Sequence, residues 1–312
     1  MKDTKNNELE KTILSVICYF DIFDYPLTLL EIFKWLNIDN SNSISLSEIK
    51  SYLDNSECLN SKVDFKDGHY FLSGRKEIIP IRIKRYNLAE YKFKKALRII
   101  KILSHFPYLK AIAVYSSLSY SNSAKSGDID LFIITAKGKI WTTRFFVNLF
   151  LKTFNLRPTK DTCQDKICVS FFVTEDSLGL LSVNDKLDVL YTYGTGQFLF
   201  VYDSDNFRSK FFSENSWLRQ QMPNWQPSSL SLRRRFYKKP TLLKRLFQFI
   251  FGRLPESWYK KIQHKILPDK IKTLMNQDTK VVISDKMIKL HDNDKRKEFG
   301  AKFNDKYNQL IQ

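Results

Sequence analysis

Two aspartates separated by one apolar residue are the strongest chemical signal in this sequence. Asp128 and Asp130 flank Ile129 at the start of an apolar run that continues to Thr135. A run of this kind, bounded by turn residues, predicts a buried strand. Alternate side chains on a strand share a face, about 6 to 7 Å apart. Two carboxylates placed in this way repel each other unless a cation lies between them, and oxygen ligands predict Mg²⁺ or Mn²⁺.

A pair of small polar residues precedes the aspartates. An apolar run from Leu109, predicted as another strand, ends at Ser116 and Ser117, and a segment rich in Ser and Asn leads on to Asp128. This order of strand, small-residue pair and Asp-apolar-Asp-apolar resembles the signature of the polymerase-beta-like nucleotidyltransferase superfamily. The resemblance implies that Asp128 and Asp130 hold the metal ions. It also implies that Ser116 and Ser117, at the start of a helix, bind the nucleotide phosphates.

The sequence departs from this family pattern at two places. The family usually has glycine where this chain has Ser116, and a Cβ restricts both the backbone angles and the approach of a phosphate. The family also has a third carboxylate on a following strand, predicted here over residues 166–174. Ser170 stands at the centre of that strand, and the first acids, Glu175 and Asp176, come at its end. Either one of these acids completes the site or the site has two carboxylates.

Three basic residues are candidates for additional phosphate contacts, namely Lys125, Lys139 and Arg144. A basic helical stretch over residues 81–103 is interpreted as a solvated face, or as a surface that approaches a nucleotide or RNA. Two functions follow. The first is an enzyme that moves a nucleoside monophosphate from an NTP to an unknown acceptor. The second is a nucleotidyltransferase-like protein without catalysis that acts as a nucleic-acid-binding or regulatory module.

Composition limits the classes of protein that fit. The chain has 312 residues, 43% of them hydrophobic, which is enough for a sizeable core and two or three domains. A polar start and the lack of a long uncharged stretch predict no secretory signal and no transmembrane segment. The four cysteines are scattered, which favours a reduced, cytoplasmic protein. A net charge of +18 favours an anionic partner.

Residues 1–80 are predicted to form a winged-helix-like domain. Three segments with helical apolar spacing precede a hairpin signal at residues 66–68, and the predicted caps are Thr28 for the second helix and Ser45 or Ser47 for the third. Three helices followed by a hairpin is the order of a winged helix-turn-helix. The domain is interpreted either as a packing module or as a DNA-binding domain, and the low positive charge of its third helix favours the packing module.

The rest of the chain is predicted to form two further parts, giving an α/β fold of the α+β type. The resemblance implies that residues 81–227 are a nucleotidyltransferase-like domain with a mixed sheet flanked by helices. Residues 228–312 are predicted to be a basic, mainly helical C-terminal region. Four segments resemble a group of bacterial and archaeal nucleotidyltransferase-domain proteins with a winged-helix-like N-terminus. They are residues 19–28, 137–146, 214–225 and 281–294.

The basic character is concentrated near the C-terminus. Between Arg233 and Lys272 there are 13 Lys and Arg and 2 acids. Apolar residues over 242–254 recur at the spacing of one helix face. Three interpretations remain open: a helix packed on the core with a basic outer face, peripheral membrane attachment, and an RNA or DNA track. In the last, bases would stack on Phe236, Tyr237, Trp258 and Tyr259.

Overall fold

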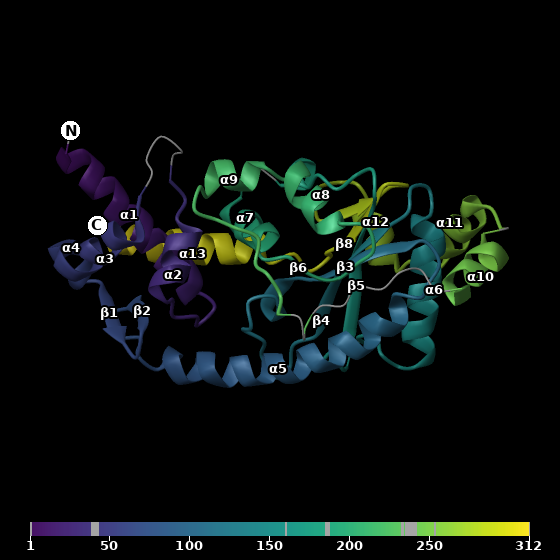
Figure 1. The fold of residues 1–312 in the computed structure, drawn as a ribbon, viewed down its shortest axis with the longest axis horizontal. Coiled ribbons are helices and arrows are strands. Elements are labelled where there is room, and N and C mark those ends of the chain that lie inside the picture. Colours follow the sequence, from purple (N-terminus) through teal and green to yellow (C-terminus); the bar gives the residue numbers. More distant parts are fainter. Residues whose placement is uncertain are drawn as a thin grey trace.

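The computed structural model describes residues 2–38, 44–159, 161–184, 188–231, 234, 242–252 and 254–311. Within these ranges the chain has a mixed α/β fold, with a six-stranded sheet flanked by helices and a two-stranded sheet nearer the N-terminus (Figure 1). The molecule is elongated. The N-terminal helices lie at one end and α10 and α11 lie at the other (Figure 1).

The predicted helices and hairpin of the N-terminal part are confirmed. Thr28 and Ser45 cap their helices in capping boxes with Glu31 and Glu48, which satisfies backbone N–H groups of each first turn. The hairpin turns through Gly68, whose φ of 77° suits glycine. The elements are α1 (Lys2–Asp21), α2 (Leu29–Trp35), α3 (Leu46–Asn55), α4 (Glu57–Asn60), β1 (Val63–Lys66) and β2 (His69–Leu72).

The central sheet has the strand order β6-β3-β4-β5-β8-β7. β4 and β5 are parallel, and the other neighbouring pairs are antiparallel. The C-terminal part, predicted to be mainly helical, therefore also supplies two strands of this sheet. The strands are β3 (Leu109–Val114), β4 (Ile129–Thr135), β5 (Ile167–Thr174), β6 (Leu199–Asp203), β7 (Val281–Ile283) and β8 (Met287–Leu290).

Helices cover both faces of this sheet. One face packs against α5 and α6, and Ile133 lies on this face within the largest apolar cluster. The opposite face packs against α8, where the ring of Phe132 contacts that of Phe211. The remaining elements are α5 (Ile78–Leu103), η1 (Ser116–Leu118), α6 (Ile140–Thr153), η2 (Leu181–Val183), α7 (Val189–Gly196), α8 (Phe207–Glu214), α9 (Trp217–Gln221), α10 (Leu242–Phe251), α11 (Glu256–Lys265), α12 (Asp269–Leu274) and α13 (Arg296–Ile311).

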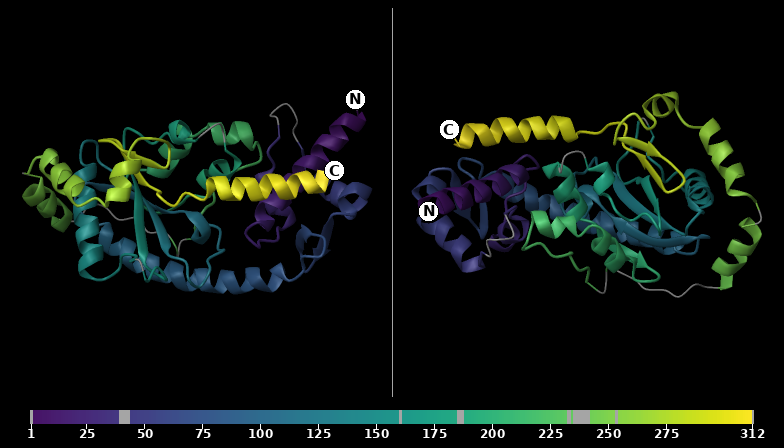
Figure 2. Two further views of the ribbon diagram at one scale, coloured as in Figure 1. Left: turned by 180° about the vertical axis from the view of Figure 1, so that it is seen from behind. Right: turned by 90° about the horizontal axis from the view of Figure 1, so that it is seen from above.

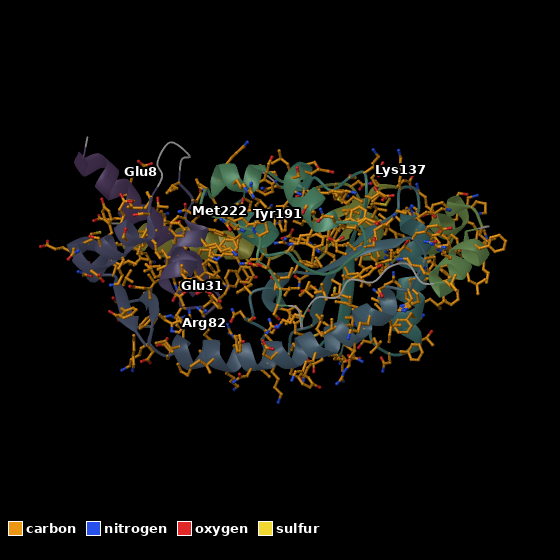
Figure 3. The ribbon with its side chains drawn as sticks, in the orientation of Figure 1. Glu8, Glu31, Arg82, Lys137, Tyr191 and Met222 are labelled. Carbon is orange, nitrogen blue, oxygen red and sulfur yellow. The ribbon has the colours of Figure 1, made fainter. Side chains whose placement is uncertain are left out.

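Ion pairs and the last helix join the N-terminal part to the rest of the chain. Arg82 of α5 donates two hydrogen bonds to the carboxylate of Glu31 on α2, at 2.8 and 2.9 Å (Figure 3). The last helix, α13, returns along α1, so both termini lie at the same end of the molecule (Figure 2). Lys306 of α13 forms an ion pair with the buried Asp21 of α1. The N-terminal helices are thus fixed to α5 on one side and to α13 on the other.

Helix α10 exposes several of its described apolar residues. Its Lys244 is buried instead, and the ammonium donates hydrogen bonds to the carbonyl oxygens of Leu109, at 2.6 Å, and Ser104, at 3.2 Å. Four of its apolar side chains are exposed to solvent, namely Leu242, Leu246, Phe249 and Ile250. In the part of the chain that the structure describes, no helix combines the length and apolar character needed to span a membrane.

Candidate functional site

The sheet topology brings the paired aspartates next to the small polar pair. Because β3 runs antiparallel to β4, the end of β3 lies beside the start of β4. The backbone N–H of Tyr115 donates to the carbonyl oxygen of Asp130 at 3.2 Å. Asp128 lies one residue before β4 and Asp130 is its second residue, which agrees with the predicted strand. Ser116 follows directly after Tyr115, and its hydroxyl lowers the pKa of the Asp130 carboxylate against the larger opposite effect of burial.

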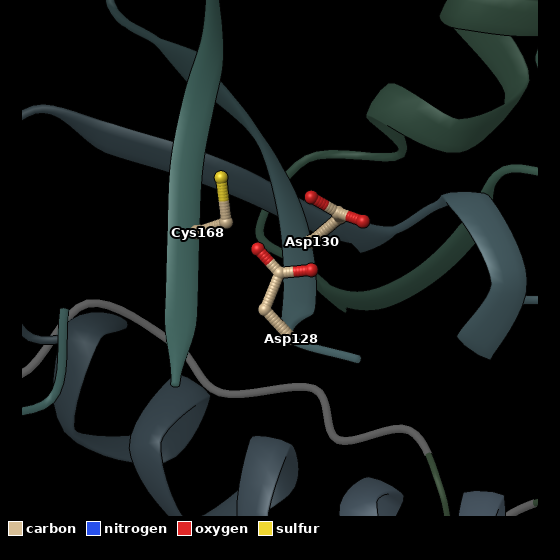
Figure 4. Close-up of side chains that lie close together, drawn as sticks. All are labelled: Asp128, Asp130 and Cys168. Atoms are coloured by element: carbon tan, nitrogen blue, oxygen red, sulfur yellow. The ribbon is translucent and has the colours of Figure 1, made fainter. Parts of the chain in front are cut away.

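A cysteine on the neighbouring strand completes a group of three side chains. β5 runs parallel to β4 in a register that places Cys168 opposite Asp130. One oxygen each of Asp128 and Asp130 and the Sγ of Cys168 lie within 4.8 Å of one another (Figure 4). Cys168 was not predicted as a site residue. The sequence did place Cys168 near the start of the strand that was expected to carry a third carboxylate, two residues before Ser170. That position could have indicated a side chain next to the aspartates.

The two carboxylates are held in a poorly solvated position. Burial, followed by the charge of Asp128, raises the pKa of Asp130 above its usual range. Burial also raises the pKa of Asp128, against the opposing effect of the Lys92 ammonium. The pKa of the Cys168 thiol is raised strongly, mainly by burial and by the two carboxylates. At neutral pH, Cys168 is therefore an uncharged thiol beside the two carboxylates. Two hard oxygen ligands short of positive charge fit Mg²⁺ or Mn²⁺.

A buried lysine positions the loop that leads to Asp128. The Lys92 ammonium, on α5, donates to the carbonyl oxygens of Ala124, at 2.8 Å, and Gly127, and lies 3.5 Å from the carboxylate of Asp165. Its side chain is only 1% exposed. The basic residues of this helix were interpreted as a solvated face, and for Lys92 that interpretation is wrong. Sequence spacing alone cannot show which carbonyl groups a lysine will meet.

Ser116 and Ser117 were predicted to bind phosphate, and the backbone of Ser116 has a conformation that glycine adopts more easily. Ser116 has a φ of 61°, in the left-handed region that favours glycine. The serine therefore occupies a position where a glycine would be less strained. Ser116 and Ser117 do not open an α-helix as expected, because η1 is a single three-residue turn. The carbonyl oxygen of Ser116 accepts hydrogen bonds from the N–H and hydroxyl of Ser119. Phosphate contacts here would come from the two hydroxyls.

The acids at the end of β5 cannot be the missing third ligand. The register of β4 and β5 places Thr135 opposite Thr174, five residues beyond the Asp130 level, or about 16 Å along the strand. Glu175 follows Thr174 at that far end and accepts a hydrogen bond from the backbone N–H of Lys137 at 3.1 Å. Asp176 forms an ion pair with Lys137 there. Of the two alternatives, the one in which Glu175 or Asp176 completes the site is therefore excluded, and the site has two carboxylates.

The three predicted basic residues lie in different surroundings. Lys125 is exposed on the loop held by Lys92, three residues before Asp128. Lys139 lies beyond the far end of β4, where its ammonium is 4.9 Å from the ring centre of Tyr108, so it does not reach the aspartates. Arg144 is buried on α6 and lines a pocket that also contains Cys168. Lys125 thus lies on the loop next to the aspartates and Arg144 in the pocket that includes Cys168, whereas Lys139 lies beyond the other end of β4.

Comparisons with known proteins leave the family open. No protein-family model, curated protein or solved structure matched this chain. The function of the site is therefore argued from its own chemistry.

Proposed function

We propose that the protein is a metal-dependent nucleotidyltransferase that moves a nucleoside monophosphate from an NTP to an acceptor. The observation that carries this proposal is the convergence of the Asp128 and Asp130 carboxylates beside Ser116 at one end of the sheet. Two half-buried carboxylates placed side by side repel each other, and such pairs are typical of functional sites. Along the sequence, a strand, a pair of small residues and two aspartates one residue apart follow one another as in the polymerase-beta-like superfamily. This resemblance supports the same reaction.

The side chains have distinct parts in this proposal. Asp128 and Asp130 would hold Mg²⁺ or Mn²⁺, which neutralises charge on the triphosphate when bound. Ser116 and Ser117 would donate hydrogen bonds to phosphate oxygens, and Lys125 would add positive charge from the loop. Cys168 would stand beside the metal site as a neutral thiol, since the pKa of the thiol is too high for a thiolate ligand at neutral pH.

The second candidate is a nucleotidyltransferase-like protein that has lost catalysis and regulates or binds nucleic acid. Two observations favour it: the left-handed backbone at Ser116 and the presence of Cys168 where a third carboxylate would complete the site. Oligonucleotide binding that weakens steeply with salt and is unchanged by Asp130→Asn would support this candidate over the enzyme.

Metal titration tests the leading proposal. Wild-type protein should bind Mn²⁺ in the presence of ATP, followed by electron paramagnetic resonance, and Mg²⁺ should compete. Asp128→Asn and Asp130→Asn should each weaken Mn²⁺ binding at least tenfold. Asp176→Asn, an acid at the far end of β5, is the matched control and should bind as wild type. Equal Mn²⁺ binding by all four proteins, or none by any, would reject a metal site at the aspartates.

We also propose that α10 contacts an anionic membrane surface. Its exposed apolar side chains lie close in sequence to exposed basic residues, among them Arg245 and Lys261, which is the combination found in interfacial helices. The nucleic-acid interpretation has less support. Of the four aromatic residues expected to stack on bases, Tyr259 is buried and Trp258 is exposed, while Phe236 and Tyr237 lie outside the described residues.

A further inference from the structure

A pocket of about 720 Å³ lies beside the aspartate site. It lies between α6, the start of β5 and the segment from α11 to α12. Cys168 belongs both to its lining and to the group with Asp128 and Asp130, so the pocket begins at one corner of the candidate metal site. A molecule bound in the pocket would therefore lie next to the place where the nucleotide is proposed to react.

The deepest cation of the pocket is a buried arginine. Arg144 is 7% exposed, and its Nη1 donates to the side-chain oxygen of Gln263 at 2.6 Å. The amide of Gln263 is fixed by donating to the carbonyl oxygens of Trp141, at 2.7 Å, and Tyr259, at 3.1 Å. The Nε of Arg144 has no hydrogen-bond partner among the described residues. Protein atoms cover this Nε, so an anion in the pocket would contact the part of the Arg144 guanidinium that stays exposed.

A second guanidinium, that of Arg157, lines the same pocket. Arg157 is exposed where it lines the pocket, and it makes no ion pair with any residue that the structure describes. Burial and the nearby charge of Arg157 lower the pKa of Arg144 to about 10. The acid in the lining, Asp292, is bound to Lys270 at 2.8 Å. The positive charge of the two arginines is therefore available to a ligand.

The remaining wall of the pocket is largely apolar. Phe145, Leu149, Ile266, Leu267 and Leu290 contribute to it. A free inorganic ion would leave this surface uncovered, whereas a ligand with an apolar body would bury it. The pocket thus combines one anion-binding end with a wall suited to hydrocarbon or aromatic groups.

We propose that this pocket binds the acceptor substrate, an apolar molecule that carries a phosphate or carboxylate group bound by Arg144 and Arg157. The inference rests on the proposed nucleotidyl transfer for the role of acceptor. The binding itself needs neither metal nor nucleotide, so the two can be tested apart.

Calorimetric titration of the full chain without metal or nucleotide tests the inference. The probes are phenyl phosphate, phenylacetate, inorganic phosphate and benzyl alcohol. Phenyl phosphate or phenylacetate should bind at least tenfold more tightly than inorganic phosphate and benzyl alcohol, and the better of the two identifies the anionic group. Arg144→Gln and Arg157→Gln should each weaken that binding at least tenfold. Lys139→Gln, a cation at the far end of β4, is the control and should bind as wild type.

The outcomes separate the pocket from the reaction. Because Arg144 is buried, its variant is first checked for cooperative unfolding, and Arg157→Gln tests the same site from the exposed rim. Equal probe binding by wild type and Arg157→Gln, or no difference between phenyl phosphate, phenylacetate and benzyl alcohol, would overturn the inference. Probe binding that persists in Asp130→Asn, when Mn²⁺ binding is lost, is the expected result. Loss of both in Asp130→Asn would contradict an independent pocket.

Discussion

Asp130 and Cys168 lie opposite each other on the parallel strands β4 and β5, and the Sγ of Cys168 lies within 4.8 Å of a carboxylate oxygen of Asp130. The pair sets the chemistry of the site, because the third side chain is neutral where a carboxylate would add charge. Two carboxylates attract a divalent cation less strongly than three do. Metal affinity is therefore expected to depend on the identity of residue 168.

Cys168→Asp is predicted to strengthen metal binding. A third carboxylate next to Asp128 and Asp130 would add an oxygen ligand, so the Mn²⁺ affinity should rise at least tenfold, or by about 1.4 kcal/mol. The cost is a less stable metal-free protein, since three buried acids repel one another. Cys163→Asp, on an exposed loop, is the control. Unchanged Mn²⁺ affinity in Cys168→Asp would contradict the placement of residue 168 at the site.

Ser116→Gly is predicted to be tolerated much better than Ser117→Gly. The left-handed backbone at Ser116 costs a non-glycine residue about 1 kcal/mol, which offsets the extra backbone entropy that glycine loses on folding. Ser116→Gly should leave the free energy of unfolding within about 0.5 kcal/mol of wild type, whereas Ser117→Gly should lower it by about 1 kcal/mol. Urea denaturation measures both. The reverse order would show that Ser116 is not strained.

Lys92→Met is predicted to destabilise the fold and the candidate site together. The substitution leaves buried carbonyl groups of the loop before Asp128 without their donor, and Asp165 without its ion pair. The free energy of unfolding should fall by about 3 kcal/mol, and Mn²⁺ binding should weaken. Lys94→Met, at an exposed position of α5, should change stability by less than about 0.5 kcal/mol. Similar losses in the two variants would contradict this role for Lys92.

His291 is predicted to make the fold sensitive to acid. Burial, with Lys289 and Arg296, lowers the pKa of His291 to about 3, and Asp294 and Asp292 oppose this only in part. The unfolded chain binds the proton near pH 6.5, so stability is present above that pH and is lost as pH falls towards 3. The slope contributed is at most about 1.4 kcal/mol per pH unit.

His291→Gln should flatten this dependence. Glutamine removes the titrating group and retains a polar partner for the Tyr115 hydroxyl, which lies 3.1 Å from the His291 ring. Urea denaturation at several values between pH 7 and pH 4 measures the slope. Identical slopes in wild type and variant would show that His291 does not control the acid sensitivity.

Vesicle sedimentation is predicted to depend on the apolar face of α10. Leu246 and Phe249 are 52% and 64% exposed, so replacing both with serine should reduce co-sedimentation with phosphatidylserine-containing vesicles several-fold. Neutral phosphatidylcholine vesicles should bind weakly. Leu30→Ser, at a comparably exposed position of α2, is the control. Unchanged sedimentation of the double variant, or single-stranded RNA binding that needs neither Leu246 nor Phe249, would argue for the nucleic-acid interpretation.

Local sequence predicted the local elements well. The caps at Thr28 and Ser45, the hairpin turn at residues 66–68 and the strand that carries Asp130 all depend on residues a few positions apart. Such patterns reflect backbone preferences and one-sided burial, which neighbouring residues determine. The fold class followed from them, since strands and helices alternate through the middle of the chain.

The partners of the aspartates were not predictable in the same way. Cys168 meets Asp130 only because β5 pairs with β4 in one register, and a shift of one residue would turn Cys168 to the other face. Lys92 reaches the loop before Asp128 from a helix far earlier in the chain. Arg144 was predicted as a phosphate contact, but its burial beside Gln263 depends on how α11 packs on α6. These relationships are set by tertiary packing.

The placement of β8 and α13 has a consequence for synthesis on the ribosome. A nascent chain that stops before residue 287 lacks β8, which pairs with one edge of β5. A chain that stops before residue 296 lacks α13, the helix that packs along α1. Until those residues emerge, β5 has an unpaired edge and the N-terminal helices expose apolar surface, both of which promote aggregation. Contacts of this sequence separation also form slowly. The fold can thus be completed only once residues 287–311 have left the ribosome.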